Sequence, residues 1–456
     1  MHATVELLQR YNKPCPRYTS YPTAVEFHDG VQEKLYINQL TQANEDSQSP
    51  WSIYMHFPFC QERCLFCACH MIKTSHQRVT DQYLDSLMKE MELVAQHIPN
   101  RRDVIQFHWG GGTPTYYSPE ALKMVMEAFK KHFSFREDAE LAIEVDPRVT
   151  TEHHVDALLD MGFNRLSMGV QDFDTKVQKA IGRFQSPQQV ENLVQYARNK
   201  GLYSINFDLV YGLPFQTPKS FENTMDKTLA LSPDRLAVYS FAYVPWMKGH
   251  QKKLDVSQLP KAEAKFTLLT IARERLLQAG YIDIGMDHFA KPEDPLAIAY
   301  QAGTMSRNFM GYTDTDCLDV LGFGISSIGN VQNGFFQNIK KLKTYCQHIE
   351  AGKLPVQRGL ILGEDDQIRQ KVIQKLMCQF AVKKTEVNEL FSIDFDQYFS
   401  TELSELTELE KEGFLQLEED CIRVLPLGKS FVRNIAVVFD RYFRQKQPSN
   451  TFSKAI

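Results

Sequence analysis

Short apolar runs alternate with segments of helical period from residue 52 to residue 279, and this alternation constrains the fold more than any other feature. Apolar runs of strand length lie at Ser52–Phe57, Gln106–Trp109, Leu141–Val145, Arg165–Val170, Asn206–Tyr211 and Leu236–Phe241. Between them, apolar residues recur at steps of three and four, as on one helix face, in 84–98, 119–132, 187–200, 217–230 and 261–279. Strands that alternate with helices are typical of βαβ units and a mostly parallel sheet.

Right-handed crossovers between parallel strands curl such a sheet into a full or partial barrel. Active sites of these folds collect at the carboxyl ends of the strands. We therefore predict an α/β fold whose chemistry-bearing residues lie just after the predicted strands.

The pattern changes beyond about residue 335. The segments 364–380, 384–392, 396–412 and 426–445 have helical character, and two short apolar runs at 415–417 and 421–425 predict a hairpin. We predict three parts: an N-terminal extension over 1–50, a barrel domain over 51–350 and a mostly helical domain over 351–456. The segment Pro16–Thr23, rich in Pro, Tyr and Thr, is expected to be extended rather than helical.

Composition and charge exclude several classes of protein. Of 456 residues, 43% are hydrophobic and 23% charged, which are globular values that exclude disorder as the overall state. The net charge of −5 does not suit a nucleic-acid coat, although a local basic pocket remains compatible with it. No apolar stretch approaches about 18 residues and the first residues lack the apolar run of a signal peptide, so we expect no membrane span and a cytoplasmic location.

Four of the nine cysteines fall within ten residues, from Cys60 to Cys69. Cys60, Cys64 and Cys67 have the spacing C-x3-C-x2-C, which lets three thiolates on one loop hold three irons of a [4Fe–4S] cluster and leaves the fourth iron open. A zinc site that uses all four cysteines and a chance group of buried thiols are the alternatives. Cys69 is assigned no role. The odd number of cysteines argues against a disulfide scaffold, and the remaining five are expected to be ordinary thiols: Cys15, Cys317, Cys346, Cys378 and Cys421.

Other candidate site residues follow the predicted strands. Three successive glycines, from Gly110 to Gly112, allow the backbone to approach a ligand closely, or else form a tight turn. Glu144 and Asp208 end apolar strands, where they either bind hydroxyl or ammonium groups or pair with a nearby Lys or Arg.

Gln171 ends another strand, and Arg183 in the segment after it suits a bidentate grip on a carboxylate. Tyr54 and His56 share one side of the strand that enters the cysteine loop and are the catalytic candidates, with a hydrogen-bonded structural histidine as the alternative. Arg17 in the N-terminal extension is either a ligand for substrate carboxylates or part of a solvated tail.

The cysteine loop, with aromatic Phe66 before Cys67, matches the radical S-adenosylmethionine (SAM) signature. Together with further motifs along nearly the whole chain, it resembles the oxygen-independent coproporphyrinogen III oxidases. These motifs are Pro16–Thr23, Tyr54–Cys60, His108–Thr115, Glu144–Arg148, Arg165–Phe173, Asp208–Pro214, Gly285–Ala290 and Arg307–Phe309, and Cys69 narrows the match further.

The resemblance implies a partial (β/α)6 radical SAM barrel that carries one [4Fe–4S] cluster and two SAM molecules. It implies anaerobic oxidative decarboxylation of two propionates of coproporphyrinogen III to vinyl groups, giving protoporphyrinogen IX, by way of a 5′-deoxyadenosyl radical. It further implies a low-potential electron donor such as flavodoxin or ferredoxin, and a monomer. By this resemblance the first SAM is bound by Tyr54, Gly111, Glu144 and Ile328, and the second by Phe66, Gly112, Thr113, Gln171, Arg183, Asp208 and Ala242.

The chain departs from the family after Arg307–Phe309, where Met310 occupies a position that usually holds Gln. A thioether forms no strong hydrogen bond, so this change affects the expected fine detail of substrate binding more than the radical chemistry. The alternatives from other classes are a related radical enzyme that acts on haem, a haem chaperone of the same superfamily and a zinc-stabilised structural protein.

Overall fold

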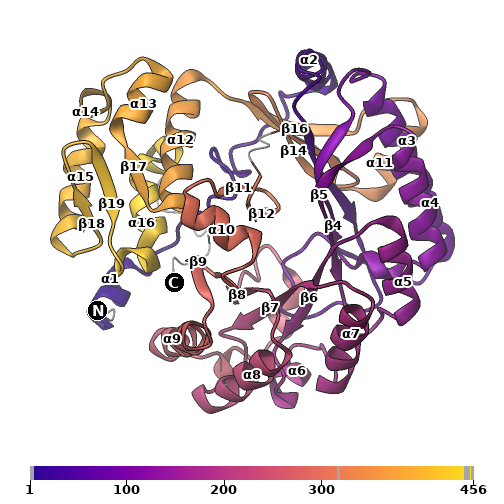
Figure 1. Ribbon diagram of the computed structural model, residues 1–456, viewed down its shortest axis with the longest axis horizontal. Helices are drawn as coiled ribbons and strands as arrows, with labels where there is room; N and C mark the ends of the chain where they lie inside the picture. Colours follow the sequence, from indigo (N-terminus) through magenta and orange to yellow (C-terminus); the bar gives the residue numbers. More distant parts are fainter. Residues whose placement is uncertain (1–4, 316–318, 446–451, 453–456) are drawn as a thin grey trace.

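The structure is a computed structural model that describes residues 5–315, 319–445 and 452, so Cys317 lies outside the described residues. One twelve-stranded sheet dominates it, with the order β16-β15-β14-β13-β1-β4-β5-β6-β7-β8-β10-β9 (Figure 1). The six predicted strands are its parallel centre: β1 (Trp51–Phe57), β4 (Asp103–Gly111), β5 (Ser134–Val145), β6 (Arg165–Gln171), β7 (Ser204–Tyr211) and β8 (Arg235–Ser240). The predicted α/β fold is confirmed.

Helices cover the outer face of this curved sheet (Figure 1). They are α3 (Gln77–Ala95), α4 (Pro119–Lys130), α5 (Glu152–Met161), α6 (Thr175–Ala180), α7 (Pro187–Asn199), α8 (Pro218–Leu231) and α9 (Ala262–Gln278). The starts of α4, α7 and α8 follow one rule: Ser118, Ser186 and Thr217 accept a backbone N–H as N-caps, and proline occupies the first turn.

Alternation along each strand separates the core from the barrel interior. On β1, Ile53, Met55 and Phe57 are fully buried in the core cluster between sheet and helices. The intervening Tyr54 and His56 therefore point to the other side, into the barrel. The register pairs Tyr54 with His108 on β4, and their rings stack at 6.0 Å between centroids.

Short antiparallel strands extend the sheet at both ends. Beside β1 lie β13 (Val320–Phe323), β14 (Ile328–Val331), β15 (Gly334–Asn338) and β16 (Val356–Ile361), and beyond β8 lie β10 (His288–Ala290) and β9 (Ile282–Gly285). Only β13 among these runs parallel to its neighbour β1. The sequence pattern does not reveal these strands because three to six residues carry too little periodicity. The helix α11 (Leu342–Glu350) returns to pack beside α3.

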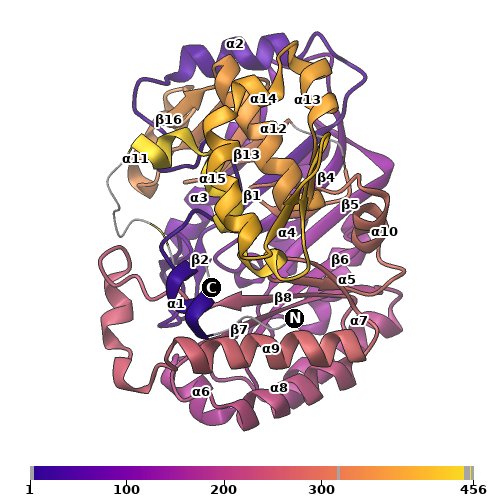
Figure 2. The same cartoon turned by 90° about the vertical axis from the view of Figure 1, so that its left-hand side faces the viewer.

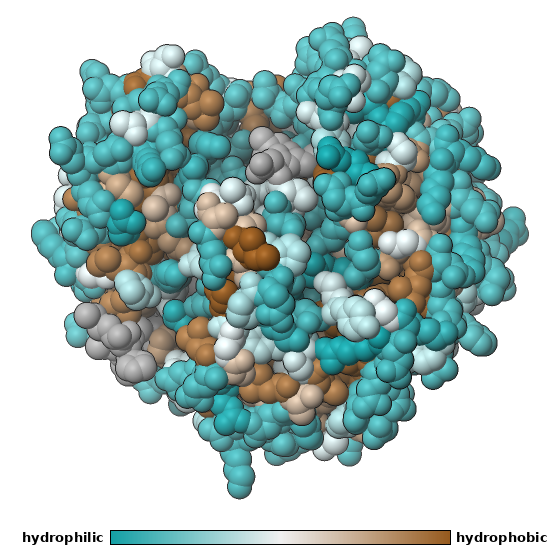
Figure 3. Space-filling view, viewed as in Figure 1, coloured by the Kyte–Doolittle hydropathy of each residue, from teal (hydrophilic) through white to brown (hydrophobic). Residues whose placement is uncertain are grey.

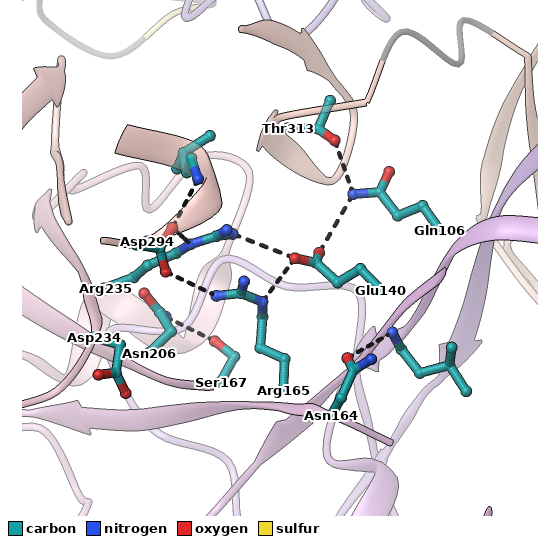
Figure 4. A network of polar contacts seen from close by, with 12 residues as sticks. Gln106, Glu140, Asn164, Arg165, Ser167, Asn206, Asp234, Arg235, Asp294 and Thr313 are labelled. Carbon is teal, nitrogen blue, oxygen red and sulfur yellow. Dashed lines mark hydrogen bonds and ion pairs between the residues drawn. The ribbon is translucent and has the colours of Figure 1, made fainter. Parts of the chain in front are cut away.

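A buried polar network lies at the amino ends of the parallel strands (Figure 4). Arg165 and Arg235 are the first residues of β6 and β8, and both pair with Glu140, at 2.8 and 3.5 Å. Arg235 also pairs with Asp294, the N-cap of α10 (Pro295–Ala302), at 2.6 Å. Although burial opposes ionisation, the two arginines lower the pKa of Glu140 to about 2. We call this the floor network.

The hairpin of β11 (Ser306–Asn308) and β12 (Gly311–Thr313) joins the floor network, since Thr313 Oγ1 accepts a hydrogen bond from Gln106 on β4 at 3.1 Å. Figure 1 looks onto this end of the molecule, with α10 and the hairpin inside the ring of strands. Ligands are therefore expected at the opposite end.

The C-terminal part has a core of its own. It contains α12 (Glu364–Gln379), β17 (Ala381–Lys383), α13 (Lys384–Phe391), α14 (Phe395–Tyr398), α15 (Ser400–Lys411), β18 (Leu415–Leu417), β19 (Cys421–Val424), α16 (Val432–Ala436) and α17 (Arg441–Gln445). The predicted hairpin is confirmed. The predicted helix 396–412 is divided at Phe399, whose fully buried ring packs on Phe395 and Phe439. The predicted helix 426–445 is wrong, because that segment is broken into α16, α17 and single 3-10 turns.

The N-terminal extension begins with α1 (Val5–Tyr11) and includes α2 (Glu33–Ala43). Its segment Pro16–Thr23 is buried against the C-terminal core, where Tyr18 donates a hydrogen bond to Asp440 at 2.9 Å. Arg433 donates to the carbonyl of Pro16 at 2.9 Å. The alternative of a solvated tail is therefore wrong.

The face seen in Figure 3 is mostly hydrophilic, with hydrophobic residues in scattered patches. Within the described part of the chain, no helix combines the length and apolar character that a membrane span requires.

Candidate active site

A cavity of about 150 Å³ lies at the carboxyl ends of β4 to β7 and gathers most of the predicted site residues. The predicted residues in its lining are Cys60, Cys64, Phe66, Cys67, Gly111, Gly112, Thr113, Glu144, Gln171, Arg183 and Asp208. Six segments of the chain thus contribute to one site: the cysteine loop, the ends of β4, β5, β6 and β7, and the segment that contains Arg183.

The cysteine loop runs between β2 (Phe59–Cys60) and β3 (Ile72–Lys73). Cys64 is buried, and its sulfur accepts from Arg183 Nη1 at 3.8 Å, a cationic donor that stabilises a thiolate. Thr113 Oγ1 lies 3.4 Å from Cys60 Sγ, and the Cys69 N–H donates to Cys67 Sγ at 3.4 Å.

These sulfurs fit a cluster better than a single ion. Among the described residues, no three His, Cys, Asp or Glu side chains come close enough together to hold one metal ion. The three thiols instead line one cavity, and the donors around them are those that a charged iron–sulfur cluster requires.

The glycines at the end of β4 give space to two site side chains. A Cβ atom on Gly110 would lie 2.7 Å from Glu144 Oε1, and one on Gly111 would lie 2.4 Å from His56 Cε1. Gly111 also has a φ of +114°, which favours glycine. Its N–H donates to Glu144 Oε2 at 3.0 Å. The glycine run therefore packs against Glu144 and His56 as well as lining the cavity.

Glu144 and Asp208 bring two carboxylates to the cavity. Glu144 accepts from His108 Nε2 at 3.3 Å, and Asp208 accepts from Asn206 at 2.9 Å, but neither pairs with a Lys or Arg of the described residues. Burial and the negative charge of Glu144 raise the pKa of Asp208 to about 7. A cationic ligand between the two carboxylates would relieve this repulsion, and SAM carries both a sulfonium and an ammonium group.

His56 lies beside the cavity rather than in its lining. Its Nδ1 is 2.9 Å from Tyr54 Oη, and its Nε2 is 2.8 Å from the carbonyl of His70, at the end of the cysteine loop. Burial lowers the pKa of His56 to about 4, so the ring is neutral. A neutral imidazole that accepts from Tyr54 and donates to His70 orients the cysteine loop.

Arg183, which lines the cavity, has one buried donor without a partner. Its Nη1 pairs with Asp146 at 2.9 Å and its Nη2 donates to the carbonyl of Gly169 at 2.6 Å, but its buried Nε has no partner. An unpartnered buried donor is rare. This arrangement fits a bound carboxylate.

Two lining residues, Asp146 and Arg148, are not among the predicted site residues. Arg148 pairs with Asp146 at 2.7 Å and lies 3.7 Å from Cys64 Sγ. A sequence signal exists for both, because they directly follow the strand β5, which ends at Val145 just after the predicted Glu144. His108 was also missed, although it occupies the equivalent side of β4.

Three other positions lie away from the cavity lining. Gln251 Nε2 donates to the carbonyl of Ala242 at 3.2 Å and to the carbonyl of Phe66 at 3.0 Å. Ile328 packs in a small separate core cluster that contains Phe309. Met310 is in the turn between β11 and β12, where its N–H donates to Asn308 at 2.9 Å.

Comparison with known proteins identifies two family models. Residues 54–228 match the Radical SAM superfamily, and residues 362–431 match the HemN C-terminal domain. The first match contains the cysteine loop and the parallel strands, and the second lies within the C-terminal core.

Whole proteins match over nearly the full length. The oxygen-independent coproporphyrinogen III oxidase of Synechocystis sp. is 41% identical over 457 residues, which cover 99% of this chain and 98% of that protein. The Salmonella typhimurium protein of the same name is 42% identical over the same shares. The solved coproporphyrinogen III oxidase (HemN) from Escherichia coli superposes with a TM-score of 0.92 at 39% identity, covering 97% of this chain and 99% of that one. The chain therefore belongs to the oxygen-independent coproporphyrinogen III oxidase family of radical SAM enzymes.

Proposed function

We propose that this protein converts coproporphyrinogen III to protoporphyrinogen IX without oxygen, by oxidative decarboxylation of two propionates to vinyl groups. The observation that carries the proposal is the single cavity in which Cys60, Cys64 and Cys67 meet the carboxylates of Glu144 and Asp208, neither of which pairs with a Lys or Arg of the described residues. The similarity to named coproporphyrinogen III oxidases over 99% of the chain supports the substrate.

Cys60, Cys64 and Cys67 would hold the [4Fe–4S] cluster, and the protein would bind two SAM molecules. When bound, the cluster and SAM supply the one-electron reductive cleavage that yields a 5′-deoxyadenosyl radical. Tyr54, Gly111, Glu144 and Ile328 serve the first SAM. The second SAM is served by Phe66, Gly112, Thr113, Gln171, Arg183, Asp208 and Ala242.

The chain's own residues position the reactants and exclude water. Glu144 and Asp208 attract the cationic groups of SAM, and the guanidinium of Arg183, whose Nε has no partner, receives a carboxylate. Tyr54 and His56 act together, since His56 fixes the cysteine loop through His70 and holds the Tyr54 hydroxyl at 2.9 Å. Each propionate loses a hydrogen atom from its β-carbon, then CO₂ and one electron, which an acceptor takes up.

The substrate carries four carboxylates, and the barrel interior contains arginines to meet them. Arg17 pairs with Asp287, and Arg307 lies 4.4 Å from the ring of Tyr312. Nε and Nη1 of Arg307 are buried and have no hydrogen-bond partner. Burial and the charges of Arg433 and Arg307 lower the pKa of Arg17 to about 10, as expected for cations held close together.

Tyr239 is influenced by the charges of both Asp208, in the cavity, and the arginines Arg17 and Arg307. After burial, the largest influence on its raised pKa is the negative charge of Asp208, which the charges of Arg17 and Arg307 oppose. Arg307 also lines a cavity of about 690 Å³ between the β11–β12 hairpin and α12, a volume suited to a large ligand.

The remaining assignments belong to the same proposal. The chain divides into an N-terminal extension (1–50), a barrel domain (51–350) and a C-terminal domain (351–456), with the last strand β16 contributed from beyond the barrel boundary. The enzyme acts as a cytoplasmic monomer that receives electrons from a low-potential donor such as flavodoxin or ferredoxin.

The test is turnover under anaerobic conditions with dithionite, SAM and coproporphyrinogen III, followed by mass analysis of the porphyrin products. The expected product has lost two carboxyl groups and carries two vinyl groups. Formation of 5′-deoxyadenosine with an unchanged porphyrinogen would overturn the substrate assignment but keep the radical SAM chemistry.

A further inference from the structure

The connection between β8 and α9 exposes two large apolar side chains beside the cysteine loop. Trp246 is 58% exposed and Met247 is 62% exposed, and they are neighbours in the sequence. The connection projects from the side of the molecule away from α10 (lower left in Figure 2). Exposed Trp and Met side chains next to each other are typical of sites that bind another protein.

Basic residues surround these two side chains. Lys248 follows them directly, and the next turn, Gly249–Lys253, adds the exposed Lys252 and Lys253. We call Trp246, Met247, Lys248, Lys252 and Lys253 the docking patch.

The basic character continues across an adjoining cleft of about 700 Å³, whose lining includes Lys253 and, from the cysteine-loop side, Arg63 and Lys73. The acidic Glu62 in this cleft pairs with Lys73 at 2.6 Å, and Asp255 follows the docking patch on the surface. Beyond the cleft, the positive charges of Lys340 and Lys248 act on His70, the residue that ends the cysteine loop. Cations thus outnumber acids here, although the whole chain has a net charge of −5.

The docking patch is joined to the cysteine loop by direct hydrogen bonds. Lys248 Nζ donates to the carbonyl of Cys69 at 3.1 Å, and His250 Nε2 lies 2.8 Å from the carbonyl of Cys67. Gln251 donates to the carbonyl of Phe66 at 3.0 Å. Lys248 thus joins the patch to Cys69, and His250, next to the patch, contacts the carbonyl of Cys67, one of the residues that would hold the cluster. These contacts give a short route for an electron.

We infer that the docking patch binds an acidic one-electron carrier protein and that the electron passes from it to the cluster across the Lys248–His250 segment. This inference rests on the proposed function, because it requires a cluster at Cys60, Cys64 and Cys67. The carrier's reduced centre loses one electron and the oxidised cluster gains it, with no other change in bonding. Charge complementarity steers the encounter, and Trp246 and Met247 supply the apolar contact.

The experiment compares two reductants with the same enzyme. Turnover of coproporphyrinogen III is measured with dithionite and, separately, with an enzymatically reduced flavodoxin of net negative charge. The test variant is K252E/K253E, and the matched control is K130E/K131E, which makes the same charge change on exposed residues at the C-terminal end of α4. Neither pair belongs to the catalytic machinery.

We expect K252E/K253E to lower flavodoxin-supported turnover at least about tenfold at low ionic strength. The lysines attract the negatively charged flavodoxin, whereas the glutamates would repel it. Its dithionite-supported turnover and that of the control stay within about twofold of wild type. A W246A/M247A variant lowers flavodoxin-supported turnover but leaves its dependence on salt unchanged.

Equal flavodoxin-supported rates in K252E/K253E and K130E/K131E would overturn the docking patch. A loss with both reductants would show a folding or cluster defect and would also overturn it. Failure of wild type to turn over with dithionite would instead overturn the proposed function, so the two failures are distinguishable.

Discussion

At the scale of single residues, three buried groups in or near the site lack an opposite charge or a hydrogen-bond partner. Asp208 has a pKa raised to about 7, Arg183 has a buried Nε without a partner, and Arg307 has two such nitrogens. Buried polar groups are normally paired. These three therefore mark places where ligands complete the structure.

The raised pKa of Asp208 predicts how SAM affinity depends on pH. Below pH 7 the free protein binds a proton at Asp208, and SAM must displace it, so we expect affinity for SAM to rise by up to about tenfold per pH unit until pH 7 and then level off. D208N removes this dependence and weakens binding. Equilibrium binding of SAM to the reconstituted protein from pH 5.5 to pH 8 measures both curves, and parallel curves would contradict the assignment.

Asp208 also makes the stability of the ligand-free protein depend on pH. Its folded pKa lies above that of the unfolded chain, so the folded state holds more protons between pH 4 and pH 7 and stability falls as pH rises through that range. D208N is expected to melt with a flatter pH dependence than wild type.

Arg307 predicts a defect in substrate binding. R307Q is expected to raise the KM for coproporphyrinogen III at least about tenfold, because a charged hydrogen bond contributes about 1.5–3 kcal/mol. R307K should recover part of the loss, since it keeps the charge and loses the bidentate geometry. The iron content and SAM affinity of both variants should equal those of wild type, and an unchanged KM would exclude Arg307 from the substrate site.

At the scale of elements, the end of β4 determines whether the cysteine loop can form. G111A places a Cβ 2.4 Å from His56 at a φ of +114°, so we expect the His56–His70 contact to break and iron retention after anaerobic reconstitution to fall severalfold. G201A is the control, because Gly201 has a φ of +90° and nothing within 4 Å. It should lose about 1–2 kcal/mol of stability and keep its iron. Equal iron contents would contradict this role of Gly111.

Some of the helices and strands can be predicted from the sequence and others cannot. The six parallel strands, the helices between them and the hairpin at β18–β19 follow from periodicity, because each is long or bounded by strong turn residues. The strands β9 to β16 do not, because they are short and are positioned by tertiary pairing. Likewise, the cysteine spacing alone predicts the metal site, whereas the proposed roles of Asp146, His108 and the exposed Trp246 depend on their neighbours in space.

At the scale of the whole molecule, the floor network joins β5, β6, β8 and α10 at the end opposite to the site. E140Q leaves Arg165 and Arg235 with one fewer buried counter-charge, so we expect a loss of about 3–5 kcal/mol in the free energy of unfolding. The folded pKa of Glu140 is about 2, so its contribution is present above the unfolded pKa and is lost as pH falls through about 4 to 2. Denaturant unfolding at pH 7 and pH 3 checks this, and a difference that is the same at both values would contradict it.

Opposite this closed floor, the carboxyl ends of β4 to β7 and the cysteine loop enclose the candidate site. The proposed reaction requires that a hydrogen atom leave a propionate β-carbon of coproporphyrinogen III and enter SAM-derived 5′-deoxyadenosine. The most direct measurement uses coproporphyrinogen III deuterated at these β-carbons in anaerobic turnover, with mass analysis of the 5′-deoxyadenosine. We expect one molecule of singly deuterated 5′-deoxyadenosine for each vinyl group formed. Vinyl formation with unlabelled 5′-deoxyadenosine would contradict this transfer.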